Sequence, residues 1–137
     1  MPTKPFFEDD HWCYACGSEN KHGLKLSFDH SQKEQLTSTV TFSKEHQGFK
    51  GVVHGGMLAV VLDDLMVNLA WRENCHAVTG ELNLRLKKPA LVGEPLSLLA
   101  WVVKKDSKII YLESSAKNSK GDLVALAKAS CVILKEA

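Results

Sequence analysis

Two adjacent carboxylates, Asp63 and Asp64, lie in the most apolar stretch of the chain, GVVHGGMLAVVLDDLMVNLAWR at positions 51–72. Burying an unpaired carboxylate costs several kcal/mol, so two of them in an apolar helix need a chemical reason. On a helix the two side chains point about 100° apart, and Asp64 has the Asn68 amide one turn away as a possible hydrogen-bond partner. Asp63 is the better candidate for chemistry, because small neighbours leave room for a substrate or a second chain. The residues on its stripe are Gly56, Ala59, Met66 and Ala70.

The start of this helix is suited to binding negative charge. Gly55 and Gly56 lie in or just before the first turn, where backbone N–H groups have no partner within the helix. These donors and the helix dipole favour an anion, and glycine lets a ligand approach the backbone closely. His54 beside them is equally consistent with a capping or packing role. Together with a central buried carboxylate, this helix start indicates acyl chemistry with a developing oxyanion.

The segment VVHGGMLAVVLDDLM resembles the motif of hotdog-fold acyl-CoA thioesterases of the phenylacetic-acid-degradation (PaaI) type. That motif is a His-Gly-Gly followed by an Asp in the middle of the helix. Three further segments agree with the resemblance, which covers nearly the whole chain. They are CYACGSENKHGLKLSF, HQGFKG and VTGELNLRLKKPALVGEPL.

The resemblance implies hydrolysis of an acyl-CoA to the carboxylic acid and coenzyme A. The Gly55 N–H would bind the thioester carbonyl, and Asp63 would act as general base or as nucleophile. Thr79 matches a Ser/Thr that positions water in similar enzymes. His54 would orient the loop and the helix start.

The same resemblance implies further substrate contacts. Relatives place an amide side chain about six residues before the histidine to help bind the carbonyl; that position is Gly48 here, and Gln47 beside it is the expected substitute. Gly56 would lie against the substrate, and we expect Asn83 and Arg85 to contact the substrate as well. Basic residues at strand ends are further candidates for the phosphates of coenzyme A or are simply solvated, namely Lys87, Lys88, Lys104, Lys105 and Lys108.

Around the helix, alternating and β-branched segments predict strands and an α+β layout, which the resemblance identifies as the hotdog fold. The sheet would be curved and antiparallel, with five to six strands. Thr79, Glu81, Asn83 and Arg85 would share the strand face away from the helix. The helix would be apolar all round because the sheet wraps one side and a partner chain covers the other. The predicted strands are residues 24–29, 35–43, 78–87, 96–104, 108–118 and 123–134.

Composition narrows the function. With 137 residues, 45% apolar and 24% charged, the chain is predicted to be one globular domain, 1–137. A net charge of +1 without a dense basic block argues against nucleic acid, and no segment is long and apolar enough for a membrane. No cofactor is expected. Four cysteines without a visible signal peptide indicate a cytoplasmic protein.

The N-terminal part, residues 1–23, is predicted to be an irregular arm ending in a Cys-x-x-Cys knuckle (residues 11–23). The knuckle holds Cys13 and Cys16, with His11 and His22 beside them, a set that could hold structural zinc. No second Cys-x-x-Cys is present, so we expect a compact turn without stoichiometric metal.

Two other functions remain open. One is a non-catalytic acyl-CoA binding protein of the same fold, although such a protein has no need to bury Asp63. The other is a hydroxyacyl-thioester dehydratase, whose typical His-Phe-Pro is absent.

Helix geometry predicts an active site shared between chains. His54 and Asp63 are nine residues apart, a rise of about 13 Å. One thioester cannot contact both on the same helix, so a homodimer with antiparallel helices is expected, and a dimer of dimers is compatible with it.

Overall fold

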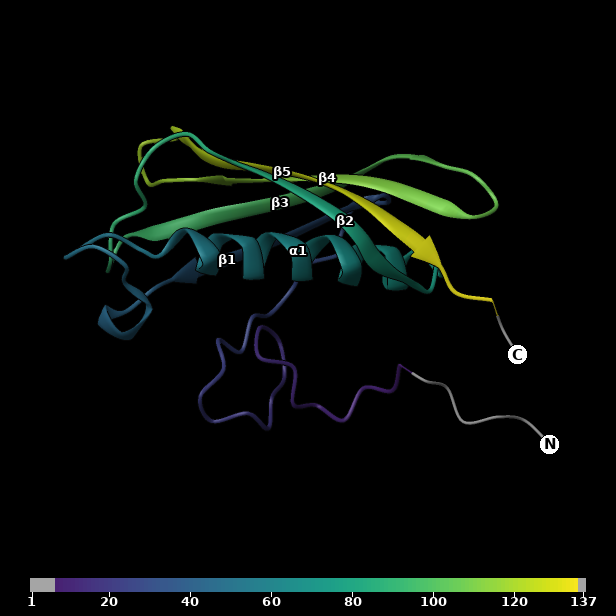
Figure 1. The fold of residues 1–137 in the computed structure, drawn as a ribbon, viewed down its shortest axis with the longest axis horizontal. Coiled ribbons are helices and arrows are strands. Elements are labelled where there is room, and N and C mark those ends of the chain that lie inside the picture. The colour runs from purple at the N-terminus through teal and green to yellow at the C-terminus, as the bar shows by residue number, and fades with distance from the viewer. Residues whose placement is uncertain (1–6, 136–137) are drawn as a thin grey trace.

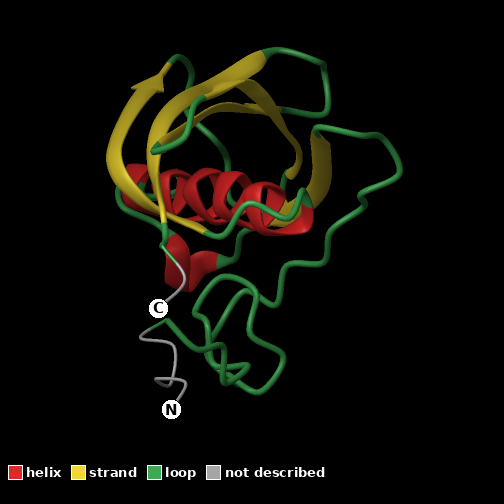
Figure 2. Ribbon diagram, turned by 90° about the vertical axis from the view of Figure 1, so that its right-hand side faces the viewer, coloured by secondary structure: helices red, strands yellow, loops and turns green. Residues whose placement is uncertain are grey.

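One long helix, α1 (Gly55–Arg72), lies across the concave face of a five-stranded sheet (Figure 1). The computed structural model describes residues 7–135. The strands are β1 (Gln35–Thr41), β2 (Ala77–Leu86), β3 (Pro95–Lys105), β4 (Ile109–Lys117) and β5 (Leu123–Ile133). Their order in the sheet is β1-β3-β4-β5-β2, and every neighbouring pair is antiparallel. The sheet curls around the helix (Figure 2), so the predicted α+β hotdog layout is confirmed with five strands.

The core lies between α1 and the concave face of the sheet. The helix begins where His54, in an extended conformation, caps it, and it ends before Asn74, whose φ of 61° is left-handed. The face of α1 that packs on the sheet is made of Leu58, Val61, Leu62, Leu65, Met66, Leu69 and Ala70.

The opposite side of α1 is covered in part by the chain's own N-terminal segment, which runs below the helix in Figure 1. Cys13, Cys16 and Leu24 pack against the core, and Ala15 is only 2% exposed. We expected a partner chain to cover this side, and the structure shows that the chain's own N-terminal segment covers part of it. Sequence periodicity showed that the helix is buried all round, but it could not show which segment buries it.

The predicted strand at 24–29 does not form. The only sheet-like pairing there is an isolated bridge from Asp29 to Thr37. Leu24 and Leu26 donate their N–H groups to the carbonyls of Tyr14 and Ala15 at 2.8 and 2.9 Å. Lys25 between them has a φ of 52°, so the backbone is not extended. The alternation of apolar residues reflects packing against the knuckle.

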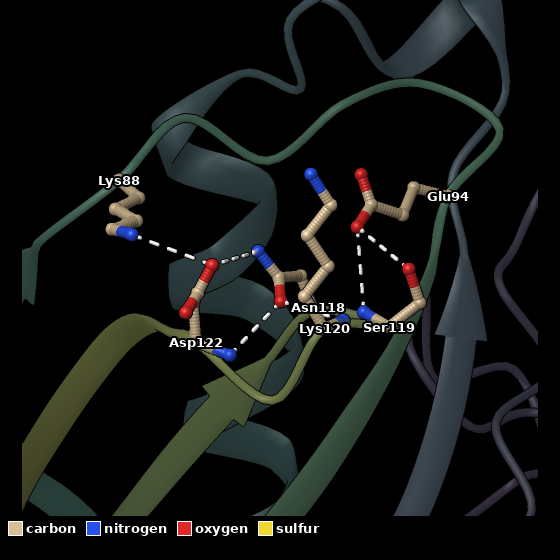
Figure 3. A network of polar contacts seen from close by, with 6 residues as sticks. All are labelled: Lys88, Glu94, Asn118, Ser119, Lys120 and Asp122. Carbon is tan, nitrogen blue, oxygen red and sulfur yellow. Dashed lines mark hydrogen bonds and ion pairs between the residues drawn. The ribbon is translucent and has the colours of Figure 1, made fainter.

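Two short segments complete the layout. One is a 3-10 turn near the helix start, Lys44–His46, and the other is the predicted hairpin turn at 118–122. Figure 3 shows how this hairpin turn is held. The Asn118 Oδ1 accepts the backbone N–H groups of Lys120 and Asp122, each at 3.0 Å. The turn is attached to the β2–β3 connection, because Glu94 accepts from the Ser119 hydroxyl at 3.0 Å and Lys88 lies 3.4 Å from Asp122.

Within residues 7–135, α1 does not combine the length and hydropathy that a membrane crossing requires, and no other helix there does.

Leu62→Ala should lower the free energy of unfolding by about 2–5 kcal/mol, because Leu62 is fully buried and the truncation leaves a cavity. Leu91→Ala is the matched control: Leu91 is 49% exposed, so the change should stay within about 0.5 kcal/mol. Denaturant unfolding of both variants at one protein concentration measures the difference. Equal losses would contradict the assignment of the core to this face of α1.

Candidate active site

Asp63 and Thr79 meet where α1 passes β2. The Thr79 hydroxyl donates a hydrogen bond to Asp63 Oδ1 at 2.6 Å, and both residues are half-buried. The bond occupies one carboxylate oxygen and leaves the other available to a substrate or to water. The sequence analysis assigned both residues to one site, and within one chain their side chains are in direct contact.

A β-bulge turns Thr79 toward the helix. Thr79 pairs with Cys131, but Glu81 pairs with Ser130, so Gly80 is an extra residue in β2. Residues paired across strands share a face of the sheet, and Cys131 is buried against the core. The prediction that Thr79 lies on the outer face with Glu81 was wrong, because the bulge shifts the alternation by one position.

Asn83 and Arg85 lie on the opposite face of the sheet from Asp63. They pair with Lys128 and Leu126, and together these residues line a groove of about 560 Å³ on the convex side. Within one chain the structure does not bring these two predicted substrate contacts to the Asp63 centre.

The helix start is organised by His54, which is exposed. Its Nδ1 accepts the Gly56 N–H at 2.9 Å, so the neutral ring carries its proton on Nε2. His54 thus caps the helix, which is one of the roles that the sequence left open. Gly55 supplies the first N–H of the helix, which has no acceptor within it. A Cβ on Gly55 would lie 2.8 Å from the Leu86 side chain, so little space separates the helix start from the end of β2.

The preceding loop holds the predicted amide. Gln47 Oε1 accepts the Gly51 N–H at 3.1 Å, which leaves its amide nitrogen as the group that can donate to a carbonyl. Gly48 donates its N–H to Val52 O at 2.9 Å and contributes backbone only.

Asp64 has a different environment from Asp63. Its Oδ1 lies 3.4 Å from Cys13 Sγ and 3.6 Å from Cys16 Sγ, and its Oδ2 is buried without a hydrogen-bond partner among the described residues. Burial raises the pKa of the Asp64 carboxyl, and burial next to Asp64 also raises the pKa of Cys16. The Asn68 amide donates to the Asp64 backbone oxygen at 2.8 Å and not to the carboxylate, for which it was a possible partner.

Sequence reasoning missed the contact between the knuckle and Asp64. The residues are 51 and 48 positions apart, and no spacing rule connects them. The one available signal was Asp64 itself, a second carboxylate in an apolar helix without an assigned role.

Comparison with known proteins identifies the family of this chain. The sequence profile of the thioesterase superfamily matches residues 50–125, more than half of the chain, including α1, β2 and the Asp63–Thr79 pair. The chain belongs to the thioesterase superfamily. It is a thioester hydrolase, and the prediction of a hotdog thioesterase is confirmed.

This thioesterase is similar to several known proteins. Mouse acyl-coenzyme A thioesterase 13 is 22% identical over 104 residues, 74% of each chain. A phenylacetic acid degradation-related protein of Ralstonia eutropha JMP134 is 25% identical with a TM-score of 0.73, covering 80% of this chain and 86% of its own. A thioesterase protein of Streptococcus pneumoniae TIGR4, solved with coenzyme A, is 14% identical with a TM-score of 0.76, covering 81% and 87%.

Thr79→Val should lower kcat of the thioesterase about 10–100-fold with little change in KM, because it removes the bond that orients Asp63. Thr79→Ser keeps the hydroxyl and should restore most of the activity. Steady-state kinetics of both variants test this. A serine variant as impaired as the valine variant would show that the threonine acts through packing of its methyl group.

Proposed function

We propose that this thioesterase hydrolyses an acyl-CoA to a carboxylic acid and coenzyme A, with Asp63 as the reacting carboxylate. The observation that carries the proposal is the Asp63–Thr79 hydrogen bond of 2.6 Å at the centre of α1. The streptococcal relative binds coenzyme A in its structure. Two further structures of that protein are of single mutants, in which alanine replaces an aspartate in one and a threonine in the other. The two mutated positions are 16 residues apart, the same separation as Asp63 and Thr79.

Two reaction courses fit this geometry. As general base, the free Oδ2 of Asp63 takes a proton from water while the water oxygen attacks the carbonyl carbon. The tetrahedral oxyanion is held by the Gly55 N–H and the Gln47 amide, and its collapse expels the coenzyme A thiolate, which takes the proton back. As nucleophile, Asp63 Oδ2 forms a mixed anhydride with loss of the thiolate, and water then hydrolyses the anhydride.

A single turnover in H₂¹⁸O tests for a nucleophilic course in which water attacks the Asp63 side of the anhydride, because only that course labels the protein. General-base catalysis puts the label in the product acid and none in the protein. A nucleophilic course with water attacking the Asp63 carbonyl leaves the label in the carboxylate of Asp63.

The proposal requires two chains per site. Because His54 and Asp63 are about 13 Å apart along one helix, the helix start of one protomer must face Asp63 of its partner. A twofold dimer supplies this arrangement twice, and a dimer of dimers retains it.

The four cysteines are unpaired, which favours a reducing cytoplasmic location.

A panel of acyl-CoAs tests the proposed activity by measuring the release of free thiol. Turnover of at least one acyl-CoA that is lost in Asp63→Asn supports it. Binding of acyl-CoA without thiol release would favour the non-catalytic binding protein. Formation of an enoyl product from a hydroxyacyl-CoA would favour a dehydratase.

A further inference from the structure

We propose that Cys13, Cys16 and Asp64 bind a zinc ion that fastens the N-terminal knuckle to the centre of α1. One ligand atom from each residue lies within 4.8 Å of the other two. The knuckle supplies both sulfurs and the helix supplies the oxygen. The site is separate from Asp63 and does not depend on the proposed reaction.

The distances match tetrahedral zinc. Zinc bonds of about 2.3 Å to sulfur and about 2.0–2.2 Å to oxygen put a sulfur and an oxygen ligand about 3.5–3.7 Å apart at the tetrahedral angle. The two thiol sulfurs lie 3.4 and 3.6 Å from Asp64 Oδ1. Both sulfur–oxygen distances are therefore close to those around a tetrahedral zinc ion, and the two sulfurs lie within 4.8 Å of each other.

The knuckle is shaped to hold its two sulfurs in place. Gly17 donates its N–H to Cys13 O at 2.8 Å and closes a tight turn around the Cys-x-x-Cys. A Cβ at Gly17 would lie only 2.4 and 2.6 Å from the Cys13 N and O atoms, so the turn admits glycine alone. The Asn68 amide points at Cys16 Sγ at 3.8 Å, the kind of outer contact that orients a metal-bound thiolate.

An ion that also binds the second oxygen of Asp64 would account for an unpaired polar atom. Asp64 Oδ2 is buried and has no hydrogen-bond partner among the described residues, which is costly for a carboxylate. A divalent cation offsets two of the three negative charges that the carboxylate and the two thiolates carry. Two sulfurs favour zinc over the oxygen-binding cations Ca²⁺ and Mg²⁺.

The ligand set differs from the one that the sequence indicated. His11 is exposed and its ring lies 3.7 Å from Asp9, and His22 is exposed as well. The third ligand comes from the helix instead. Three protein ligands leave one position of the tetrahedron for water or for the second oxygen of Asp64. This inference replaces the expectation of a metal-free knuckle, which rested on the absence of a second Cys-x-x-Cys.

Elemental analysis of the full chain, purified without chelator in the presence of a phosphine reductant, tests the site. About one zinc per chain is expected, because affinities of such ligand sets are high at neutral pH. The double variant Cys13→Ser/Cys16→Ser and Asp64→Asn should each lose at least about tenfold in zinc affinity. Asp63→Asn is the matched control, since it removes the neighbouring carboxylate and should keep the zinc.

Cobalt provides a test that needs no variant. Co²⁺ added to the chelator-stripped wild-type protein should give a thiolate-to-metal charge-transfer band and the visible bands of tetrahedral cobalt. Wild-type protein without zinc and without these bands would overturn the proposal, as would a Cys13–Cys16 disulfide in protein purified under reductant. Undiminished zinc in both ligand variants would also overturn it, because the ion would then be bound elsewhere.

Discussion

Asp63→Asn should lower turnover of the best acyl-CoA substrate by about 10²–10⁴-fold, because an amide cannot accept the proton or attack the carbonyl. The fold should be unchanged, since the amide oxygen can still accept the Thr79 hydrogen bond. Steady-state kinetics and circular dichroism of the variant measure both effects. More than about a tenth of wild-type activity would be incompatible with Asp63 as the reacting group.

Asp64→Asn is the control for this prediction. Asp64 faces the knuckle and not Thr79, so its replacement should reduce activity far less. An equal loss in the two variants would mean that the reacting carboxylate had been assigned to the wrong neighbour, provided that both proteins are folded.

Mixing two inactive variants should restore about a quarter of wild-type activity, because in the proposed dimer each site draws on two chains. Asp63→Ala removes the carboxylate that we propose reacts. Gly55→Pro removes the N–H donor at the first helical position, where proline is tolerated. His54 has φ −60° and ψ 132°, a conformation that a following proline permits. Each homodimer should be inactive, and a heterodimer should hold one intact and one doubly defective site.

The experiment is an unfolding and joint refolding of the two variants, with heterodimer formation followed by differently tagged chains. Gly55→Ala serves as the steric control, because it adds the same contact with Leu86 but keeps the N–H. If it is far more active than Gly55→Pro, the lost donor explains the defect. A mixture that exchanges chains but gains no activity would contradict the shared site.

The helix and the five strands could be predicted because their signals are local. The apolar run of α1 and the β-branched alternation of β1 depend on residues a few positions apart. The Asp63 candidate followed in the same way from its place in that helix. The proposed residue roles came from the resemblance, and membership in the thioesterase superfamily supports the reaction class.

The errors came from features that local patterns do not encode. A single bulge at Gly80 moved Thr79 to the helix side, and a left-handed Lys25 prevented a strand at 24–29. Both alter backbone geometry at one residue while the apolar pattern stays the same. The contact of Cys13 and Cys16 with Asp64 depends on where the N-terminal segment crosses the helix, which tertiary packing alone decides.

The position of β2 at one edge of the sheet affects how the enzyme folds during its synthesis. Within residues 7–135 its only neighbouring strand is β5, and Thr79 pairs with Cys131, 52 positions later. Such a distant pairing is slow to form, because a long loop must close before its contacts contribute. On the ribosome, α1 can form while β2 still has no strand to join. The apolar side of β2 then remains exposed until β5 has been synthesised. Over that interval the nascent chain can aggregate or bind chaperones.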